Sequence, residues 1–355
     1  MKLEKASHKT IEKPTVNDVA RVAGVSLATV DRVLNARQGV RQKTINKVQA
    51  AISELGYVRD TAAANLARNR TYKFLFVLPD WKGQFFKELR RSIDEVAESA
   101  RYDRTEVETL LVPNHDHTFL ASRVGGLTSR DIDGVAIMAN ETPVVRDAIA
   151  GLHARGVPVV SLVSDQPNSV RDHFVGIDNT SAGRTAGMLM GRFLGDRSGK
   201  VIVAVSSKQS RDMLERRIGF DEILRKHFPK IQALPSIEGR EDPAHTEQVL
   251  RRSLDAYPDV VGVYSAGASV VGVAAAVMGH DSPIRPIFID HELTDASADF
   301  LQRGVLDAVI TQNTGHIARS ALRVLRARCD NTPVIRSQEY IRIDIVIREN
   351  LPKQE

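Results

Sequence analysis

Side chains suited to hold a polar small molecule recur along the chain directly after apolar segments of strand length. Aromatic residues follow the first such segment, and amides, carboxylates and an arginine follow later ones. Aromatic rings stack on the apolar face of a sugar, whereas carboxylate, amide and guanidinium groups bind its hydroxyls through paired hydrogen bonds. The candidate ligand-binding residues are Asp80, Trp81, Phe85, Phe86, Asn140, Ser164, Asp165, Arg216, Glu292 and Gln312.

A second set of residues near the N-terminus has the spacing of two short helices. Gly24 ends the first helix, and Ser26 is a good N-cap for a second one over 27–34. Two short helices joined by a tight turn form a helix-turn-helix, although an αα-corner unrelated to DNA gives the same pattern. The second helix would present to a DNA major groove the side chains of Leu27, Ala28, Thr29, Asp31 and Arg32.

The net charge of +5 is unevenly distributed along the 355 residues. Residues 1–70 contain 13 Lys or Arg against 6 Asp or Glu, a net charge of +7, and the remainder contains 36 against 38, a net charge of −2. A cationic region that coincides with the helix-turn-helix pattern indicates nucleic acid as its partner, because phosphate neutralisation supplies much of DNA affinity. The alternative is an ordinary solvated basic surface.

The N-terminal region divides into three parts. Residues 1–13 are polar and basic, and we expect them to form a disordered arm. Residues 14–59 are expected to form the headpiece, in which Thr15 and Asp18 have the spacing of a capping box. The apolar spacing of residues 42–55 predicts a third helix in this headpiece. Residues 60–70 are Ala-rich and too short for a stable isolated helix. They are either a hinge that folds on DNA, with Leu66 as a wedge in the minor groove, or a plain linker.

From residue 71 onward, apolar strand-length runs alternate with amphipathic helices. This alternation predicts parallel sheets covered by helices on both faces, and the number of strands favours two doubly wound subdomains facing each other. We expect one subdomain over 71–172 plus 312–332 and the other over 173–311 plus 333–355. Ligands bind outside the carboxyl ends of such strands, so the candidate residues should converge on one cleft. The predicted strands are 73–78, 105–111, 134–138, 158–162, 173–177, 200–205, 232–237, 260–264, 286–289 and 307–311.

Several classes of protein are disfavoured by composition. The single cysteine, Cys329, gives no disulfide framework and no metal-binding cysteine cluster, and no motif for a cofactor is present. The N-terminus lacks the apolar segment of a signal peptide and no run spans a membrane, so we expect a cytoplasmic protein. His291 beside Glu292 could act in acid–base catalysis, but no nucleophile motif accompanies them, so an enzyme is only the alternative hypothesis.

The headpiece and the core together resemble a known family. The stretches VNDVARVAGVSLATVDRVLN and GVRQKTINKVQAAISELGY are similar to the headpiece of LacI/GalR-family transcription regulators, and AAANLA at 62–67 resembles their hinge helix. The rest resembles the sugar-binding proteins of the periplasm. The resemblance implies an all-α headpiece joined to an α/β core of the periplasmic-binding-protein-like type I fold. It also implies a homodimer that binds a near-palindromic operator, and a sugar-like effector between the subdomains that controls operator affinity.

Residue roles carried over from the family remain expectations. Leu27 and Ala28 lie at the positions where the family reads bases, and Arg32 matches an arginine that could bind guanine. Thr29 and Asn35 match positions that contact the phosphates or the backbone of the DNA. Asp31 departs from the usual serine and leaves the half-site sequence open. Thr15 and Ser26 complete the set of expected DNA-contacting residues.

In the core, the resemblance places Arg216 where the family binds its effector, and Phe85 and Phe86 resemble the aromatic pair of ribose-type binding proteins. Glu292 and Gln312 match a ligand carboxylate and a hinge-side amide. A dimer is expected because no leucine-heptad segment follows the last strand, predicted at 340–347. We therefore expect a ligand-responsive repressor without a cofactor; the effector and the direction of its effect stay open.

Overall fold

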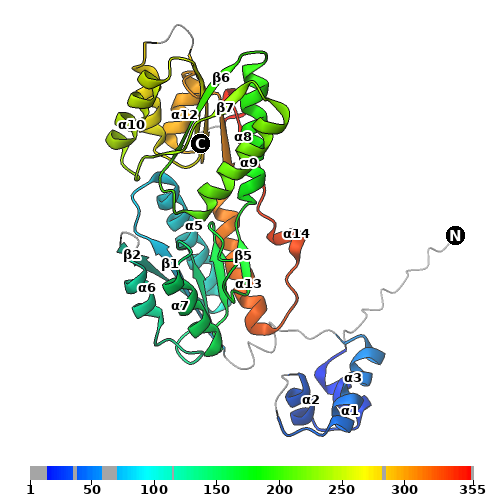
Figure 1. Ribbon diagram of the computed structural model, residues 1–355. Coiled ribbons are helices and arrows are strands. Elements are labelled where there is room, and N and C mark those ends of the chain that lie inside the picture. Colours follow the sequence, from blue (N-terminus) through cyan, green and yellow to red (C-terminus); the bar gives the residue numbers. More distant parts are fainter. Residues whose placement is uncertain (1–13, 35–37, 58–69, 114–115, 282–284, 353–355) are drawn as a thin grey trace, which may run out of the picture. The chain divides into compact units, whose positions relative to one another are not determined.

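The computed structural model describes residues 14–34, 38–57, 70–113, 116–281 and 285–352 (Figure 1). The chain divides into two units, residues 1–70 and residues 71–355, which we term the headpiece and the core. Within the described ranges, no helix is both long and apolar enough to cross a lipid bilayer.

The headpiece consists of α1 (Val16–Ala23), α2 (Leu27–Leu34) and α3 (Gln42–Leu55), with the bounds expected from the sequence. Val19, Val30 and Val48 are completely buried between the three helices and form their core. Gly24 ends α1 with a φ of 64°, a left-handed conformation that glycine adopts without strain, and this reversal starts the tight turn into α2. Local signals were enough to predict this unit because caps and apolar spacing act within a few residues.

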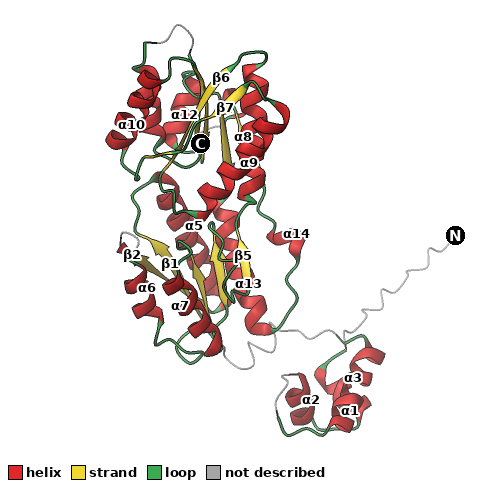
Figure 2. Ribbon diagram, viewed as in Figure 1, coloured by secondary structure: helices red, strands yellow, loops and turns green. Residues whose placement is uncertain are grey.

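The first subdomain of the core contains a parallel sheet in the order β2-β1-β3-β4-β5. Helices α5 (Gln84–Ala100) and α13 (Thr314–Asp330) pack together over one face, and α6 (His117–Val124) and α7 (Pro143–Ala154) pack over the other (Figure 2). A short 3₁₀ turn, η1 (Arg101–Asp103), follows α5. The strands are β1 (Tyr72–Pro79), β2 (Thr105–Val112), β3 (Gly134–Ile137), β4 (Val159–Leu162) and β5 (His173–Val175).

The second subdomain contains a sheet in the order β12-β11-β10-β9-β6-β7, with β8 also paired to β6. All pairs are parallel except β11 with β12. Its strands are β6 (Gly199–Val205), β7 (Ile231–Ala233), β8 (Ile237–Glu238), β9 (Val260–Ser265), β10 (Ile287–His291), β11 (Ala308–Gln312) and β12 (Ile343–Val346). Its helices are α8 (Asn179–Leu194), α9 (Arg211–His227), α10 (Pro243–Ala256), α11 (Val270–Met278) and α12 (Asp295–Gln302); the short α14 (Arg336–Glu339) and η3 (Arg348–Asn350) lie near the end of the chain.

The continuous apolar strands explain why both sheets are covered. Every residue of β3 and β4 is buried, which requires helices on both faces of the sheet. Helices α8 and α9 approach each other at glycines: a Cβ on Gly183 would be 1.9 Å from the carbonyl oxygen of Arg216, and one on Gly219 would be 2.0 Å from that of Thr180. The predicted doubly wound class of the core is confirmed.

Two expectations about this core are wrong in detail. Strand β5 pairs with β4 and β11 pairs with β10, so residues 173–175 belong to the first subdomain and residue 312 to the second. The predicted strand 232–237 is two short strands, β7 and β8, because Pro235 lies between them and cannot donate a ladder hydrogen bond.

Candidate functional site

Helix α2 of the headpiece exposes the side chains at its N-terminal end. The Oγ of Ser26 accepts a hydrogen bond from the backbone N–H of Thr29 at 3.2 Å, which caps the helix. Leu27 is 50% exposed, and Ala28 and Arg32 are also exposed, whereas Val30 faces the headpiece core. An exposed apolar start followed by an arginine suits a helix that enters the major groove.

Thr15 has a structural contact as well as an exposed position. Its hydroxyl donates to Asp18 Oδ2 at 2.7 Å, and its own Oγ accepts from the Asp18 backbone N–H at 3.3 Å, which completes the expected capping box. The backbone N–H of Thr15 also donates to Asp18, and this contact, with the guanidinium of Arg21, lowers the pKa of Asp18 to about 2.

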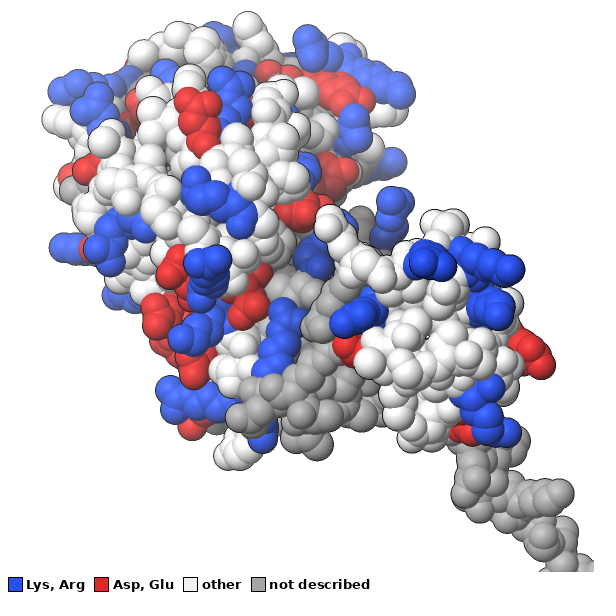
Figure 3. Space-filling model, turned by 90° about the horizontal axis from the view of Figure 1, so that it is seen from below, with Lys and Arg blue, Asp and Glu red and all other residues white. Residues whose placement is uncertain are grey.

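The other expected DNA-contacting residues differ in their surroundings. Thr29 is half-buried, with its hydroxyl 2.9 Å from that of Ser26, and Asp31 is half-buried on α2. Asn35 and Leu66 lie outside the described residues. Figure 3 shows Lys and Arg side chains on the visible surface of the headpiece with fewer acidic ones among them.

In the core, a cavity of about 460 Å³ lies between the two subdomains, at the carboxyl ends of their strands. Its walls come from the loop after β1 and the start of α5, from the ends of β3 and β4, and from the start of α9 and the end of β10. The volume falls in the range of small-molecule sites. Seven of the expected ligand-binding residues line it: Trp81, Phe85, Phe86, Asn140, Ser164, Arg216 and Glu292.

The first subdomain supplies an aromatic wall to this cavity. The rings of Trp81 and Phe86 meet edge to face with centroids 4.6 Å apart, and those of Phe85 and Phe86 meet at 5.3 Å. These geometries are favourable for aromatic pairs and hold the three rings in one cluster. The cluster offers apolar ring surface to a ligand, opposite the charged side chains of the second subdomain.

Arg216 anchors the opposite wall. Its side chain is almost fully buried, donates through Nε to Asn179 Oδ1 at 2.9 Å, and lies 3.5 Å from Glu292 Oε1. Gln312 does not line the cavity, but its amide donates to the same Glu292 oxygen at 2.7 Å and so positions that carboxylate. Two side chains therefore already hold Glu292 in place.

Ionisable groups at the end of β10 are buried. Burial raises the pKa of Asp290 well above its ordinary range and lowers that of His291 well below its own. His291 Nε2 is 2.7 Å from the hydroxyl of Tyr264, whose pKa burial also raises. Burial raises the pKa of Glu292 too, while the charge of Arg216 works in the opposite direction. Because its pKa is lowered, the imidazole of His291 is neutral at physiological pH.

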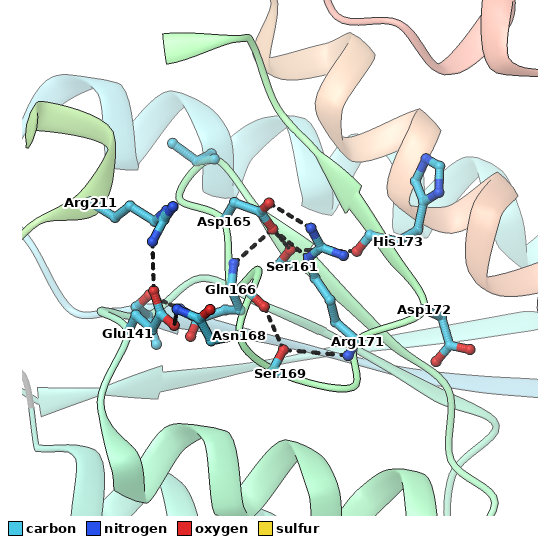
Figure 4. Close-up of polar contacts among 12 residues, drawn as sticks. Glu141, Ser161, Asp165, Gln166, Asn168, Ser169, Arg171, Asp172, His173 and Arg211 are labelled. Carbon is cyan, nitrogen blue, oxygen red and sulfur yellow. Dashed lines mark hydrogen bonds and ion pairs between the residues drawn. The ribbon is translucent and has the colours of Figure 1, made fainter. Parts of the chain in front are cut away.

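Two expected ligand-binding residues point to other partners. Asp80 does not line the cavity; it is exposed and 3.4 Å from Arg90. Asp165 accepts hydrogen bonds from Ser161, from the Gln166 backbone and from Arg171 (Figure 4). The rule that ligands bind at the carboxyl ends of parallel strands placed Asp80 and Asp165 at strand ends correctly. It could not give the direction in which each side chain points.

The turn after β4 explains the position of Asp165. Val163 has a φ of 61°, which is a strained conformation for a β-branched residue. Ser164 then lines the cavity, and Asp165 is bound by Arg171 from the same loop. Arg211 of α9 donates to Glu141 at 2.8 Å near this network and links the two subdomains (Figure 4).

Several cavity residues were missed as ligand-binding candidates, above all Asp212 and Glu241. Asp212 lies four residues before Arg216, on the same face of α9, so helical spacing could have indicated it. Glu241 follows the short β8, which the sequence did not separate from β7. In the part of the chain that the structure describes, no His, Cys, Asp and Glu cluster could hold a metal ion.

Comparison with protein families identifies both units. Residues 15–60 match the model of bacterial regulatory proteins of the lacI family, and residues 74–333 match that of the periplasmic binding protein domain. The HTH-type transcriptional regulator pepR1 of Lactobacillus delbrueckii subsp. lactis is 35% identical over 129 residues, 36% of this chain and 37% of its own length. RegA of Clostridium saccharobutylicum, another HTH-type transcriptional regulator, is 37% identical over 38% of this chain and 39% of its own length.

The matched region thus spans little more than a third of these relatives. Among solved structures, the glucose-galactose binding protein GanP of Geobacillus stearothermophilus superposes with a TM-score of 0.70 at 19% identity, over 80% of this chain and 100% of its own. A solute-binding protein of Burkholderia graminis in complex with D-arabinose gives 0.70 at 21% identity, over 79% and 96%. These two likenesses establish the fold of the core.

Proposed function

This chain belongs to the periplasmic binding protein domain family and carries a lacI-family headpiece, and we propose that it is a sequence-specific transcriptional regulator controlled by a small ligand. The observation that carries the proposal is the presence in one chain of an exposed recognition helix and of a cavity lined by aromatic and charged side chains. Neither feature is needed for the other's fold, since each unit has its own core.

In this proposal, α2 reads the operator bases through Leu27, Ala28 and Arg32. The residues that contact the DNA backbone, or orient those that do, are Thr15, Ser26, Thr29 and Asn35. Two copies of the chain bind a near-palindromic site as a homodimer, with Leu66 of each hinge in the minor groove. The chain acts in the cytoplasm on double-stranded DNA, as a repressor, and needs no cofactor.

The ligand is proposed to be a sugar or sugar derivative. Support comes from the aromatic cluster of Trp81, Phe85 and Phe86 facing the charged groups around Arg216. The superposed GanP is named a glucose-galactose binding protein, and the Burkholderia protein holds D-arabinose. Asn140, Ser164 and Glu292 would bind hydroxyl groups, and Gln312 would hold Glu292 in position.

Two measurements test the proposal. Selection from random duplexes with the full chain should yield a symmetric consensus, and a thermal-shift screen of pentoses, hexoses, polyols and sugar phosphates should yield a compound that raises the melting temperature. The same compound should change operator affinity and be recovered unaltered. Absence of any sequence preference would contradict the regulatory role, and chemical turnover of the compound would favour an enzyme.

A further inference from the structure

The cavity of the core is more acidic than a site for a neutral sugar needs to be. Four carboxyl side chains line it, of which Asp290 keeps its proton because burial raises its pKa, against two permanent cations, Lys82 and Arg216. The histidines that line it add no positive charge, because burial lowers the pKa of both His117 and His291. The lining carboxyl groups are those of Asp212, Glu241, Asp290 and Glu292.

Lys82 and Arg216 do not balance the negative charge of the lining carboxylates. Arg216 is paired with Glu292 at 3.5 Å and donates to neutral acceptors through its other nitrogens. Lys82 is exposed. Within the described residues, no cation lies at ion-pair distance from Asp212 or Glu241, so two carboxylates face the cavity without a counterion, and burial raises the pKa of Asp290 so that it keeps its proton.

Two of the four lining carboxyl groups also have an oxygen without a hydrogen-bond donor. Asp212 is 7% exposed and Asp290 is 1% exposed, yet Oδ1 of each lacks a partner among the described residues. Leaving a buried acceptor unsatisfied costs about 1–3 kcal/mol. Because both residues line the cavity, a ligand that enters it can supply the missing donors.

The aromatic cluster reaches the acidic wall at Gly83. A Cβ on Gly83 would be 3.3 Å from Phe86 Cδ2 and 3.6 Å from Glu241 Oε2. The Phe86 ring of the first subdomain and the Glu241 carboxylate of the second therefore converge on one point of the cavity. An aromatic ring beside a carboxylate is favourable for an organic cation, through cation–π attraction and a charge-assisted hydrogen bond.

We propose that the ligand of this cavity is a small polyhydroxylated molecule with one protonated amine, such as an amino sugar or an amino polyol. The ammonium group lies between Glu241 and Asp212 on one side and the Trp81–Phe86 rings on the other. Hydroxyl groups donate to Asp290 and Glu292. This inference rests on the proposed ligand-controlled function and specifies the chemistry of its effector.

Electrostatics in the cavity agree with this assignment. Desolvation and the neighbouring charge of Asp212 raise the pKa of Glu241. Desolvation, with a smaller contribution from Asp212, also raises the pKa of Glu292 against the opposing charge of Arg216. An ammonium placed among these carboxylates would reverse the effect, because an opposite charge favours the ionised form. A neutral sugar would leave the mutual repulsion in place.

The test compares matched pairs of probes on the full chain by calorimetry and thermal shift. D-glucosamine, D-galactosamine, D-mannosamine and 1-amino-1-deoxysorbitol are each paired with the neutral compound in which a hydroxyl replaces the amine. At least one amine should bind ~10-fold or more tightly than its neutral partner, since a hydrogen bond to a charged group contributes ~1.5–3 kcal/mol. Binding of neutral members only, or of no member, overturns the inference.

Variants then locate the ammonium group. Glu241→Gln keeps the shape of the side chain but removes its charge, so it should remove most of the preference for the amine by weakening amine binding more than binding of the neutral partner. Glu222→Gln is the matched control on α9, because Glu222 pairs with Arg184 and does not line the cavity. An unchanged preference in Glu241→Gln would contradict the placement.

These outcomes separate the inference from the function on which it rests. Neutral sugars that bind and alter operator affinity would leave the regulatory proposal standing and refute the amine. An amine that binds without altering operator affinity would support the cavity chemistry and refute the regulatory role.

Discussion

Replacing Arg216 with alanine should destabilise the core in a pH-dependent way. The substitution leaves Glu292 buried without its cation, with Gln312 as its hydrogen-bond donor among the described residues. Glu292 then takes up a proton, and holding a carboxyl of ordinary pKa 4.5 neutral costs at most about 3.4 kcal/mol at pH 7 and below about 1 kcal/mol at pH 5. The lost contacts to Asn179 and Ala266 add about 1 kcal/mol each at any pH.

Urea unfolding at the two pH values measures this loss directly. The destabilisation by Arg216→Ala should be at least ~1 kcal/mol smaller at pH 5 than at pH 7. Adding Glu292→Gln should remove that difference, because the amide needs no cation. Arg225→Ala, at an exposed position of the same helix, should cost less than about 0.5 kcal/mol. Equal losses at both pH values, unaffected by Glu292→Gln, would refute the reasoning.

Three further substitutions test other parts of the structure. Gly183→Ala should cost at least about 2 kcal/mol, because its Cβ would overlap the carbonyl oxygen of Arg216, whereas Gly126→Ala, with no atom within 4 Å of its Cβ, should be nearly neutral in urea unfolding. Burial raises the pKa of Asp290, so the folded chain keeps that proton after the unfolded chain loses it, and stability falls as pH rises above about 4. Asp290→Asn should therefore gain stability relative to the native chain between pH 4 and 7, and parallel pH curves would exclude the effect. Arg32→Ala should weaken operator binding by about 1–3 kcal/mol but scrambled duplex far less, as measured by fluorescence anisotropy; equal losses would mean a phosphate contact instead.

The headpiece could be predicted closely from the sequence because its determinants are local. Ser26 and Gly24 define the turn between α1 and α2 by capping, and apolar spacing selects the buried valines. The strands of the core were predictable for a related reason, since apolar runs between helices have few alternatives in a doubly wound fold. The break at Pro235 was missed because the apolar residues Leu234 and Ile237 near it fit the pattern of one continuous strand.

The cavity was predictable only to the level of strand ends. The rule that ligands bind at the carboxyl ends of parallel strands brought Trp81, Asn140 and Arg216 together across 136 positions of sequence. It failed for Asp165, since the nearby Arg171 competes for that carboxylate and no pattern in the sequence ranks such partners. The subdomain boundary was wrong because strand pairing, which assigns β5 to β4, depends on contacts distant from 173–175.

Reciprocal linkage between the cavity and the operator tests the central claim most directly. Operator affinity of the full chain is measured with and without saturating ligand, and ligand affinity with and without saturating operator. Coupled sites must change each other's affinity by the same factor, and we expect at least ~5-fold in both directions. A factor of one in both experiments, with each partner bound normally, would show that the two sites are independent and would contradict the account.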